Sequence, residues 1–385
     1  MATDAPDFNP DVHPHRRFNP LLGEYVLVSP HRANRPWQGQ VEEPQKSDKP
    51  QYDPKCYLCP GNARTSGHNN PEYTSVYTFP NDFAAVLPPP LPEVQPAGHP
   101  LLKIQPVDGA CDVVVFHPRH DLTLARLKTE EIVNVVDEWC RIYRERGCQD
   151  NIKYVQIFEN KGAMMGCSNP HPHGQAWSTS SIPNIPAKEL ESLAQYSTSE
   201  AVSPATAPKG PNGRPCLLCD YAHLEASEAS SVRTVFKNED WIAVVPWWAI
   251  WPFEILLLPH RRHIPSVLDL TPDEKGSLAN IISKITIRYD NLFSCSFPYS
   301  MGLHQRPTPN SNTSSGGPHD EHDVAHMHFH FEPPLLRSST VRKFLVGYEL
   351  MAEPQRDLTP EQAASRLRAC SDVHYLDGAS VVQEP

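Results

Sequence analysis

YVQIFENKGAMMGCSNPHPHGQAW, residues 154–177, is the stretch of this chain that says most about its fold and its chemistry. The apolar start at residues 154–158 predicts a strand, residues 162–169 predict a loop of small residues, and a second extended segment follows. Side chains two positions apart on an extended segment share one face. His171, His173 and Gln175 are therefore expected to point the same way, into whatever the loop encloses.

The loop at residues 162–169 has the composition of a phosphate-binding loop. Gly162, Gly166 and Ser168 are small, and free backbone N–H groups in such a loop can bind an anion. It is not a P-loop, because Lys161 precedes the glycines and no Gly-Lys-Ser/Thr follows. Taken alone, a His-x-His pair is more often two surface histidines on a hairpin, so the rest of the sequence has to decide.

Composition and charge narrow the class of protein. A chain of 385 residues predicts two domains, or one large domain built of two halves. The formal net charge of −11 argues against a surface that coats nucleic acid, so a phosphate ligand needs a local positive site. Proline makes up 42 of the 385 residues, about twice the usual share, which predicts long loops and few helices.

Neither a secretory signal nor a membrane span is expected. The first twenty residues are polar, and the most apolar run, residues 241–259, contains Glu254 and three prolines, which favours buried strands. The ten cysteines include two Cys-x-x-Cys pairs, which in a chain without a leader favour thiolates and bound metal over disulfides. The sequence predicts a cytoplasmic protein with no nucleic-acid or membrane partner.

The motifs of the first half of the chain return in the same order in the second half. A Cys-x-x-Cys pair, an Asn/Asp turn with a strand, an apolar strand ending in histidine, an amphipathic helix and a His-x-His strand occur twice. They lie at residues 56–59, 79–87, 111–120, 129–146 and 171–173, and again at 216–219, 236–246, 255–263, 271–289 and 328–330. We predict two copies of one α+β unit, residues 1–195 and 196–385. Residues 178–215 predict a linker with a short helix at 187–196, and residues 306–323 an insert of loop composition.

Four residues of the first half have the types and positions of a structural zinc site. Cys56 and Cys59 lie on one tight turn, while His120 and His171 lie on two other segments. Tetrahedral zinc takes four sulfur and nitrogen ligands of this kind, and a site ligated wholly by protein has no open position for catalysis. The alternative is a set of buried, unreactive thiols.

A second cluster can be drawn in two ways. Glu189, His304, His328 and His330 offer three imidazoles and a carboxylate, which suit iron or zinc. Alternatively, Cys216, Cys219 and His263 combine with His328 into a copy of the first zinc site. Both sets use His328, so both cannot hold as stated, and a histidine-rich surface beside the insert is a third interpretation.

With His171 bound to metal, His173 remains free for chemistry. An imidazole is largely neutral at pH 7 and can attack phosphorus without a separate base. Attack gives a phosphoramidate, from which the group can be passed on. Gln175 can donate a hydrogen bond to a phosphoryl oxygen but has no proton to transfer, and its alternative interpretation is a polar residue at the rim.

Six segments of the chain resemble the galactose-1-phosphate uridylyltransferase family. They are GCSNPHPHGQAW with RANRPWQG, FPNDFAAV, YSMGLH, PPLLRSSTVRKFLVGYE and LTPEQAA, and the resemblance spans about residues 20 to 370. The family has the histidine-triad superfold, so the resemblance implies an α+β fold of two histidine-triad-like halves, each a mainly antiparallel sheet (half-barrel) with packed helices. It implies ping-pong transfer of UMP: UDP-glucose uridylylates a histidine and releases glucose 1-phosphate, and galactose 1-phosphate takes the UMP to give UDP-galactose.

The resemblance also assigns residues. It implies His173 as nucleophile and Gln175 as the residue that steadies the phosphoryl group. It implies metal ligands in two sets, zinc on Cys56, Cys59, His120 and His171, and iron or zinc on Glu189, His304, His328 and His330. Nucleotide and sugar contacts are implied at Arg32, Arg35, Asn81, Asp82, Asn160, Gly166, Cys167, Ser168, Gln175, Lys343, Phe344, Val346, Tyr348 and Glu349. It further implies a homodimer with shared active sites, in which residues 343–349 could come from the partner. The Cys216/Cys219 pair lies outside the family's metal pattern.

Two other classes of function stay open on the residues alone. A histidine-triad nucleotide hydrolase or dinucleotide phosphorylase is disfavoured by Gln175, which stands where a third histidine could act as an acid. A non-catalytic, zinc-stabilised binding protein is disfavoured by the net acidity of the chain together with a complete phosphate loop.

Overall fold

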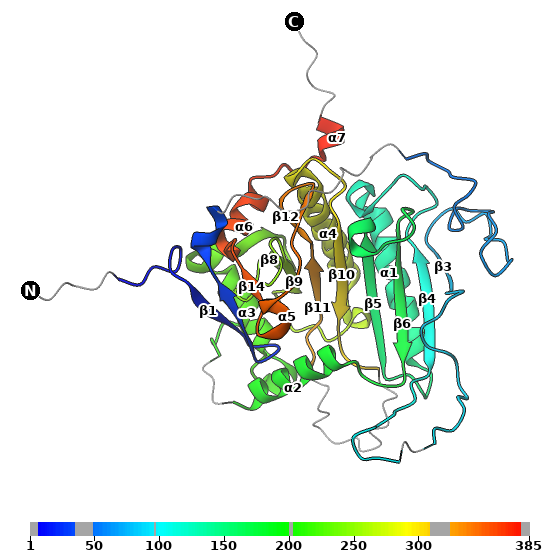
Figure 1. The fold of residues 1–385 in the computed structure, drawn as a ribbon, viewed down its shortest axis with the longest axis horizontal. Helices are drawn as coiled ribbons and strands as arrows, with labels where there is room; N and C mark the ends of the chain where they lie inside the picture. Colours follow the sequence, from blue (N-terminus) through cyan, green and yellow to red (C-terminus); the bar gives the residue numbers. More distant parts are fainter. Residues whose placement is uncertain (1–6, 35–48, 96–97, 200–202, 309–323, 379–385) are drawn as a thin grey trace, which may run out of the picture.

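A single antiparallel sheet runs through the whole molecule (Figure 1). The computed structural model describes residues 7–34, 49–95, 98–199, 203–308 and 324–378. Within this part, nine strands join in the order β3-β4-β6-β5-β10-β11-β9-β8-β7. Their bounds are β3 (Tyr77–Pro80), β4 (Gly109–Val115), β5 (Tyr154–Lys161), β6 (His173–Thr179), β7 (Thr234–Lys237), β8 (Trp241–Val244), β9 (Ile255–Pro259), β10 (Tyr299–His304) and β11 (His328–Glu332).

The two halves of the sequence meet in the middle of this sheet. β5 ends the first half-sheet and β10 begins the second, and the two pair antiparallel with Asn160 opposite Ser300. The strand order on one side of this join mirrors the order on the other, as expected for two copies of one unit related by an approximate two-fold axis. The α+β class and the two mainly antiparallel half-sheets are confirmed, and the half-sheets form one continuous layer.

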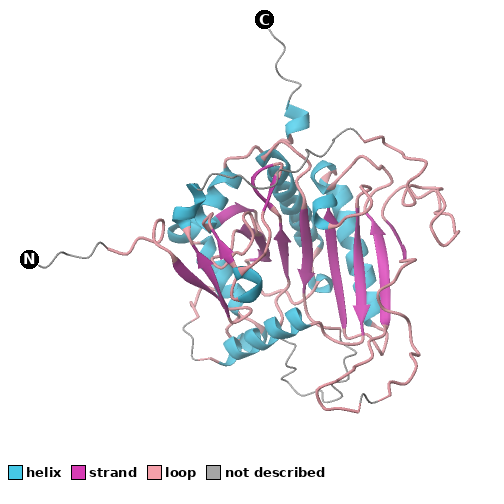
Figure 2. Ribbon diagram, in the orientation of Figure 1, coloured by secondary structure: helices cyan, strands magenta, loops and turns pink. Residues whose placement is uncertain are grey.

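Two long helices cover one face of the sheet (Figure 2). They are α1 (Thr129–Gly147) and α4 (Pro272–Leu292), which contact each other and occupy equivalent places in the two halves. The amphipathic helix expected at residues 129–146 is α1, and its apolar residues spaced three and four apart are all buried: Ile132, Val135, Val136, Trp139 and Tyr143. Trp139 packs on Phe329 of β11 with ring centroids 6.0 Å apart, so the core is continuous between the halves.

Smaller elements surround this layer. A second sheet, of order β1-β2-β14, contains strands from both ends of the chain, and a short ribbon pairs β12 with β13. The remaining elements are β1 (His15–Asn19), β2 (Glu24–Val28), β12 (Leu335–Ser338), β13 (Val341–Arg342), β14 (Gln355–Arg356), α2 (Asn184–Thr198), α3 (Leu217–Ala226), α5 (Tyr348–Met351), α6 (Pro360–Arg368) and α7 (Tyr375–Gly378), with short 3-10 turns between them.

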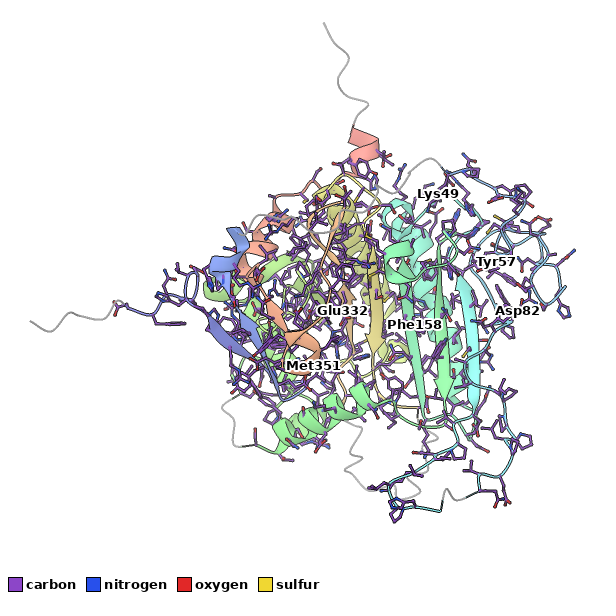
Figure 3. All side chains as sticks on the ribbon, viewed as in Figure 1. Lys49, Tyr57, Asp82, Phe158, Glu332 and Met351 are labelled. Carbon is purple, nitrogen blue, oxygen red and sulfur yellow. The ribbon has the colours of Figure 1, made fainter. Side chains whose placement is uncertain are left out.

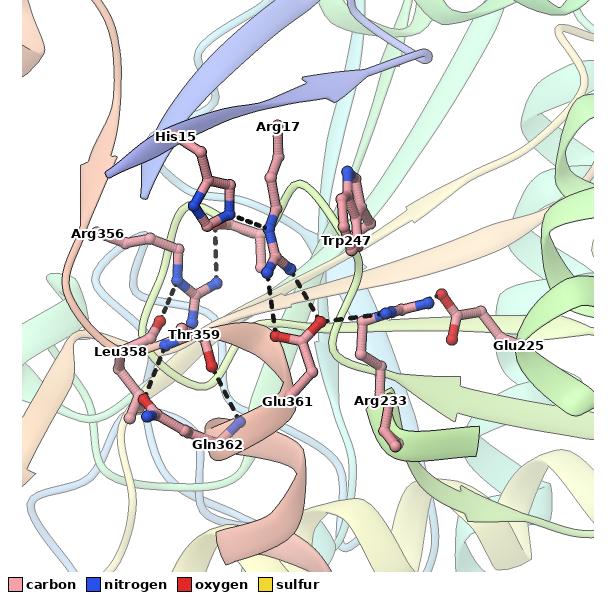
Figure 4. A network of polar contacts seen from close by, with 12 residues as sticks. His15, Arg17, Glu225, Arg233, Trp247, Arg356, Leu358, Thr359, Glu361 and Gln362 are labelled. Atoms are coloured by element: carbon pink, nitrogen blue, oxygen red, sulfur yellow. Dashed lines mark hydrogen bonds and ion pairs between the residues drawn. The ribbon is translucent and has the colours of Figure 1, made fainter. Parts of the chain in front are cut away.

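An ionic network holds strand β1 against helix α6 (Figure 4). The carboxylate of Glu361 on α6 accepts two hydrogen bonds from Arg17 on β1, at 2.9 and 3.2 Å, and one from Arg233 at 3.1 Å. The Arg17 guanidinium also lies 3.8 Å from the ring centroid of Trp247. Because the Arg17 side chain is only 2% exposed, this carboxylate supplies the counter-charge that offsets the cost of burying it.

Some expected elements differ from those observed. Residues 83–87 form no strand, because the chain turns away after Asn81, whose side chain accepts the N–H of Phe83. The short helix expected at 187–196 is longer and spans α2, and the proposed boundary between residues 195 and 196, which falls near its end, remains a prediction. Most of the expected insert lies outside the described residues. No helix in the described part of the chain is long and apolar enough to cross a membrane.

Candidate active site

The opening stretch of sequence folds as a strand, a loop and a strand around a cavity. β5 leads into the loop, in which Gly162 and Gly166 have φ of 86° and 77°, values that suit glycine because it has no Cβ. The chain returns as β6, paired to both β5 and β4. A cavity of about 360 Å³ lies between the loop and His173, lined also by Asn160, Cys167 and Ser168. Another cavity, of about 350 Å³, is also lined by His173 and Ser168, together with Asn81, Asp82 and Gln175.

His173 is held as one defined tautomer. Its Nδ1 lies 2.8 Å from the backbone oxygen of His171, and a carbonyl oxygen can only accept, so Nδ1 carries the proton. The lone pair of the neutral ring is therefore on Nε2. Burial lowers the pKa of His173, which outweighs the hydrogen bond to the His171 carbonyl and keeps the ring uncharged at neutral pH. The side chain lines both cavities, so a reactive nitrogen faces space that a ligand can enter.

Gly174, between the candidate residues His173 and Gln175, lets β6 lie close to its neighbours. A Cβ at this position would stand 2.8 Å from the backbone oxygen of Phe158 and 2.9 Å from the ring of Phe116. Any larger residue would push the strand outward and move His173 with it.

The amide of Gln175 is oriented by two donors. Its Oε1 accepts from Nε1 of Trp177 at 3.0 Å and from Nδ2 of Asn81 at 3.4 Å. The oxygen is thereby occupied, and the NH2 group is left to donate toward the second cavity. The predicted pair of a free imidazole and a donating amide is thus brought together on one face of β6.

The four predicted ligands of the first metal site lie together and are buried. Their donor atoms are all within 4.8 Å of one another. Nδ1 of His171 is 3.5 Å from Sγ of Cys59 and 3.8 Å from Sγ of Cys56, and Nδ1 of His120 is 3.7 Å from Sγ of Cys59. Ligands of one tetrahedral zinc, at about 2.3 Å for sulfur and 2.0–2.1 Å for nitrogen, lie roughly 3.6 Å apart. The donor set therefore fits zinc.

The ring of His171 is oriented by a contact outside the cluster. Its Nε2 lies 2.8 Å from the backbone oxygen of His117, so Nε2 carries the proton and Nδ1 offers its lone pair to the sulfurs. Burial lowers the pKa of His171 to about 4, which keeps this lone pair free at neutral pH. One residue thus serves two sites, because its side chain joins the metal cluster while its carbonyl fixes the tautomer of His173.

The second predicted cluster also forms. Oε2 of Glu189 on α2 is 2.7 Å from Nδ1 of His304 and 3.4 Å from Nε2 of His328, and Oε1 is 3.6 Å from Nε2 of His330. Among the described residues, the Nε2 atoms of His328 and His330 are buried without a hydrogen-bond partner. Buried polar atoms are normally paired, so two such nitrogens facing one carboxylate fit a metal ion.

The alternative set built on Cys216, Cys219 and His263 is wrong in one residue. Their donor atoms group with His326, while His328 belongs to the Glu189 cluster. Three groups with metal-ligand chemistry therefore form in the described part of the chain, and no residue is shared between them.

The predicted substrate contacts divide into two sets. Asn81, Asp82, Asn160, Cys167 and Ser168 line the cavities beside His173, and Gly166 is part of the same loop. The other set lies elsewhere. Arg32 is 3.7 Å from Asp357, and residues 343–349 lie on the C-terminal side, where Lys343 pairs with Glu349 at 2.5 Å and Phe344, Val346 and Tyr348 are exposed. Figure 3 shows Met351, just after this segment, well away from Asp82. Arg35 lies outside the described residues.

Lys49 lines the first cavity and was missed by sequence reasoning. Its Nζ donates to the backbone oxygen of Pro170 at 3.2 Å, at the end of the phosphate loop. Lys161, which also lines this cavity, is paired with Asp290 at 2.7 Å. Lys49 is therefore the lysine of this cavity whose charge is not already matched by a carboxylate contact. A lone lysine before the Cys-x-x-Cys turn carries no recognisable motif.

Both halves of the chain match known family profiles. Residues 6–183 match the profile described as the N-terminal domain of galactose-1-phosphate uridyl transferase, and residues 189–379 match its C-terminal domain. The galactose-1-phosphate uridylyltransferase of Cryptococcus neoformans is 52% identical over 94% of this chain and 92% of its own length. Those of Saccharomyces cerevisiae and Haemophilus influenzae are both 48% identical, over 97% and 96% of this chain and 99% and 98% of their own.

Solved structures resemble the fold along most of its length. A uridylyltransferase structure is 26% identical, with a TM-score of 0.66 over 92% of this chain and 97% of its own. An ADP-glucose phosphorylase from Arabidopsis thaliana is 20% identical, with a TM-score of 0.67 over 93% of this chain and 99% of its own. The second likeness is one of fold alone.

Proposed function

This chain belongs to the galactose-1-phosphate uridylyltransferase family, and we propose that Nε2 of His173 carries the uridylyl group in its reaction. The protein is a nucleotidyltransferase that moves UMP from UDP-glucose to galactose 1-phosphate. The observation that carries the proposal is the tautomer of His173, whose Nδ1 lies 2.8 Å from a backbone oxygen, so that the lone pair is on Nε2.

In the first half-reaction Nε2 attacks the α-phosphorus of UDP-glucose. A P–N bond forms, the bond between the α-phosphorus and the bridging oxygen breaks, and glucose 1-phosphate leaves with that bond's electron pair. The ring gains positive charge as the bond forms, and the His171 carbonyl that accepts from Nδ1–H stabilises it. In the second half-reaction a phosphate oxygen of galactose 1-phosphate attacks the same phosphorus and the imidazole leaves.

The leaving group explains why an amide suffices at position 175. A sugar phosphate departs as a stable anion and needs no proton, so no general acid is required. The NH2 of Gln175 is free to donate to a non-bridging oxygen, where negative charge accumulates. The backbone N–H groups of residues 162–169 and the charge of Lys49 are the further candidates for holding phosphate beside His173.

We also propose the metal ligands. Cys56, Cys59, His120 and His171 would hold a structural zinc that fixes the strand carrying His173. Glu189, His304, His328 and His330 would hold iron or zinc between α2, β10 and β11, at a distance in the sheet from His173. Neither ion takes part in the steps described above.

The segment at residues 343–351 supports a homodimer. The side chains of Val346, Tyr348 and Met351 are 58%, 53% and 86% exposed. Large hydrophobic side chains exposed together in one short segment are typical of a protein–protein interface. We propose that this segment meets a second copy of the chain and supplies Lys343, Phe344, Val346, Tyr348 and Glu349 to the partner's site. None of the ten cysteines is in a disulfide, which is consistent with a reducing, cytoplasmic location.

Labelling tests the nucleophile. Wild-type protein incubated with UDP-glucose labelled in the α-phosphate should acquire acid-labile label. His173→Ala should acquire none, while His99→Ala, a matched change at an exposed histidine, should label like wild type. Labelling of His173→Ala at the wild-type rate would place the nucleophile elsewhere.

Mixing inactive variants tests the shared site. If each site takes His173 from one chain and Lys343 from the other, a random mixture of His173→Ala and Lys343→Ala subunits should regain about a quarter of the wild-type sites. No recovery after subunit exchange, checked by the mass of mixed dimers, would show that each site is built from one chain.

A further inference from the structure

We propose that Cys216, Cys219, His263 and His326 bind a zinc ion, so that the chain holds a second Cys2His2 site in addition to the two metal sites described above. The four donor atoms lie within 4.8 Å of one another. Three of the four residues are buried and His263 is half-buried. The site has no open position and is structural.

Each of the four residues has a counterpart of the same type in the first zinc site. Cys216 is the N-cap of α3 and Cys219 lies in its first turn, while Cys56 and Cys59 lie on a turn outside any helix. In both pairs a backbone N–H is directed at the first sulfur: Cys219 N at 3.5 Å from Cys216 Sγ, and Leu58 N at 3.4 Å from Cys56 Sγ. His263 follows β9 as His120 follows β4. His326 precedes β11 by two residues as His171 precedes β6. Retention of all four ligand types at four scattered positions indicates a retained ion.

The distances between the sulfur and nitrogen atoms are slightly longer than those of a zinc-bound site. Sγ of Cys219 is 3.8 Å from Nδ1 of His263 and 3.9 Å from Nε2 of His326. These separations are a few tenths of an ångström above the roughly 3.6 Å expected for sulfur and nitrogen on one zinc ion. Small shifts of the side chains are enough to close the tetrahedron.

A zinc ion at this site would fix the position of His328. Nδ1 of His328 lies 2.8 Å from the backbone oxygen of His326, as Nδ1 of His173 lies 2.8 Å from that of His171. In both halves a metal-bound histidine thus fixes the tautomer of the histidine two residues on. In the first half this leaves Nε2 free for chemistry. In the second half it leaves Nε2 of His328 free to face Glu189, where the next metal binds.

The hydrogen bonds of the His326 ring predict that the Cys216 site binds zinc less tightly than the Cys56 site. The backbone N–H of Ile264 donates to Nδ1 of His326 at 3.1 Å, while Nε2 lies 3.3 Å from the Pro259 oxygen. Zinc on Nε2, the nitrogen that lies near Cys219, requires the proton of the neutral ring to be on Nδ1, so binding gives up both of these bonds. His171 makes no such exchange. The Cys216 site should therefore bind zinc more weakly, by up to roughly a hundredfold, the worth of two hydrogen bonds.

Cobalt titration of the wild-type chain tests the proposal without a mutation. Cobalt bound by thiolates absorbs through sulfur-to-metal charge transfer, which the Glu189 cluster cannot produce because it has no sulfur. After removal of native metal under reducing conditions, this absorption should rise until two equivalents of thiolate-bound cobalt per chain are reached. Saturation at one equivalent would overturn the proposal.

Paired variants assign the site. Cys216→Ser/Cys219→Ser should lose about half of the charge-transfer absorption and one zinc per chain, and should weaken metal binding at the Glu189 cluster through His328. Cys148→Ser/Cys370→Ser, which removes two cysteines outside the three clusters, is the matched control and should lose neither. If both double variants retain the full absorption, the Cys216 pair binds no metal. If the first fails to fold, the wild-type titration still decides.

Discussion

Replacement of Gln175 by alanine removes the hydrogen-bond donor that we propose is aimed at the reacting phosphate. Oε1 is occupied by Trp177 and Asn81, so the NH2 is the part of this side chain left for substrate. Loss of one preorganised donor to a developing anion lowers a rate by roughly 100- to 1000-fold. The contact between His173 and the His171 carbonyl does not involve Gln175, so the nucleophile itself is kept. We expect the rate of uridylylation to fall by this factor, with substrate binding weakened much less.

Rapid quenching of the first half-reaction measures this effect. UDP-glucose labelled in the α-phosphate is mixed with excess enzyme, and the acid-labile protein-bound label is followed with time. Trp177→Phe is the matched control, since it keeps the Gln175 amide but loses one hydrogen bond to it; at about 1 kcal/mol, that loss should slow the step about fivefold. A Gln175→Ala rate within about threefold of wild type would refute the role of the amide.

Three further changes test other parts of the structure. His171→Ala should lose about one zinc per chain and lower the thermal midpoint, because the cluster loses a ligand; an unchanged zinc content by metal analysis would be incompatible with the first site. Glu361→Gln should destabilise the protein by about 3 kcal/mol in urea unfolding, because the buried Arg17 loses its carboxylate partner, while Arg233 keeps Glu225 at 2.8 Å. Burial opposes ionisation of Glu361, but the contacts with Arg17 and Arg233 outweigh burial and lower the pKa of Glu361 below 4.5. The stabilisation by the ionised carboxylate is therefore present above pH 4.5 and is lost as the pH falls through the lowered pKa. The stability difference between the variant and the wild type should shrink in that range. Lys49→Ala should raise the KM for UDP-glucose about tenfold and reduce its dependence on salt, and an unchanged KM would remove Lys49 from the phosphate site.

The parts of the fold that could be predicted are those with a strong local signal. α1 has apolar residues at spacings of three and four, and every position expected to face inward is buried. The β5–loop–β6 stretch was predicted for a similar reason, since alternation on a strand fixes which side chains share a face. Residues 83–87 have comparable apolar content but form only an isolated bridge, Leu87 with Asp108, and a sheet position cannot be read from one segment.

The error at the second Cys2His2 group has a physical origin. His326, His328 and His330 alternate along one strand and its approach, so all three have the parity of a shared face. Aligning the second half to the first with an error of two residues keeps each histidine on the same face of its strand. The insert before His326 makes the correct alignment impossible to find from spacing alone. Only the three-dimensional pairing of β11 with β10 and β9 separates the histidine that meets the cysteines from the one that meets Glu189.

The contacts that could not be predicted from pattern alone are those made across long distances in the chain. Lys49 reaches the end of the phosphate loop through a backbone oxygen, a contact that depends on no particular residue type. Glu189 was grouped with the histidines on residue type and again through family likeness, but its place among them requires α2 to lie beside β10 and β11.

The pairing of β5 with β10 determines how this polypeptide can be divided. Both strands are the innermost of their half-sheets, and α1 rests on α4 across the same line. A chain severed between α2 and α3 should stay together and remain active as a two-piece protein. Either piece produced by itself would leave a long strand with unpaired N–H and C=O groups. The N-terminal piece could satisfy them by aligning its β5 with that of a twin, so that an approximate internal symmetry becomes a true one.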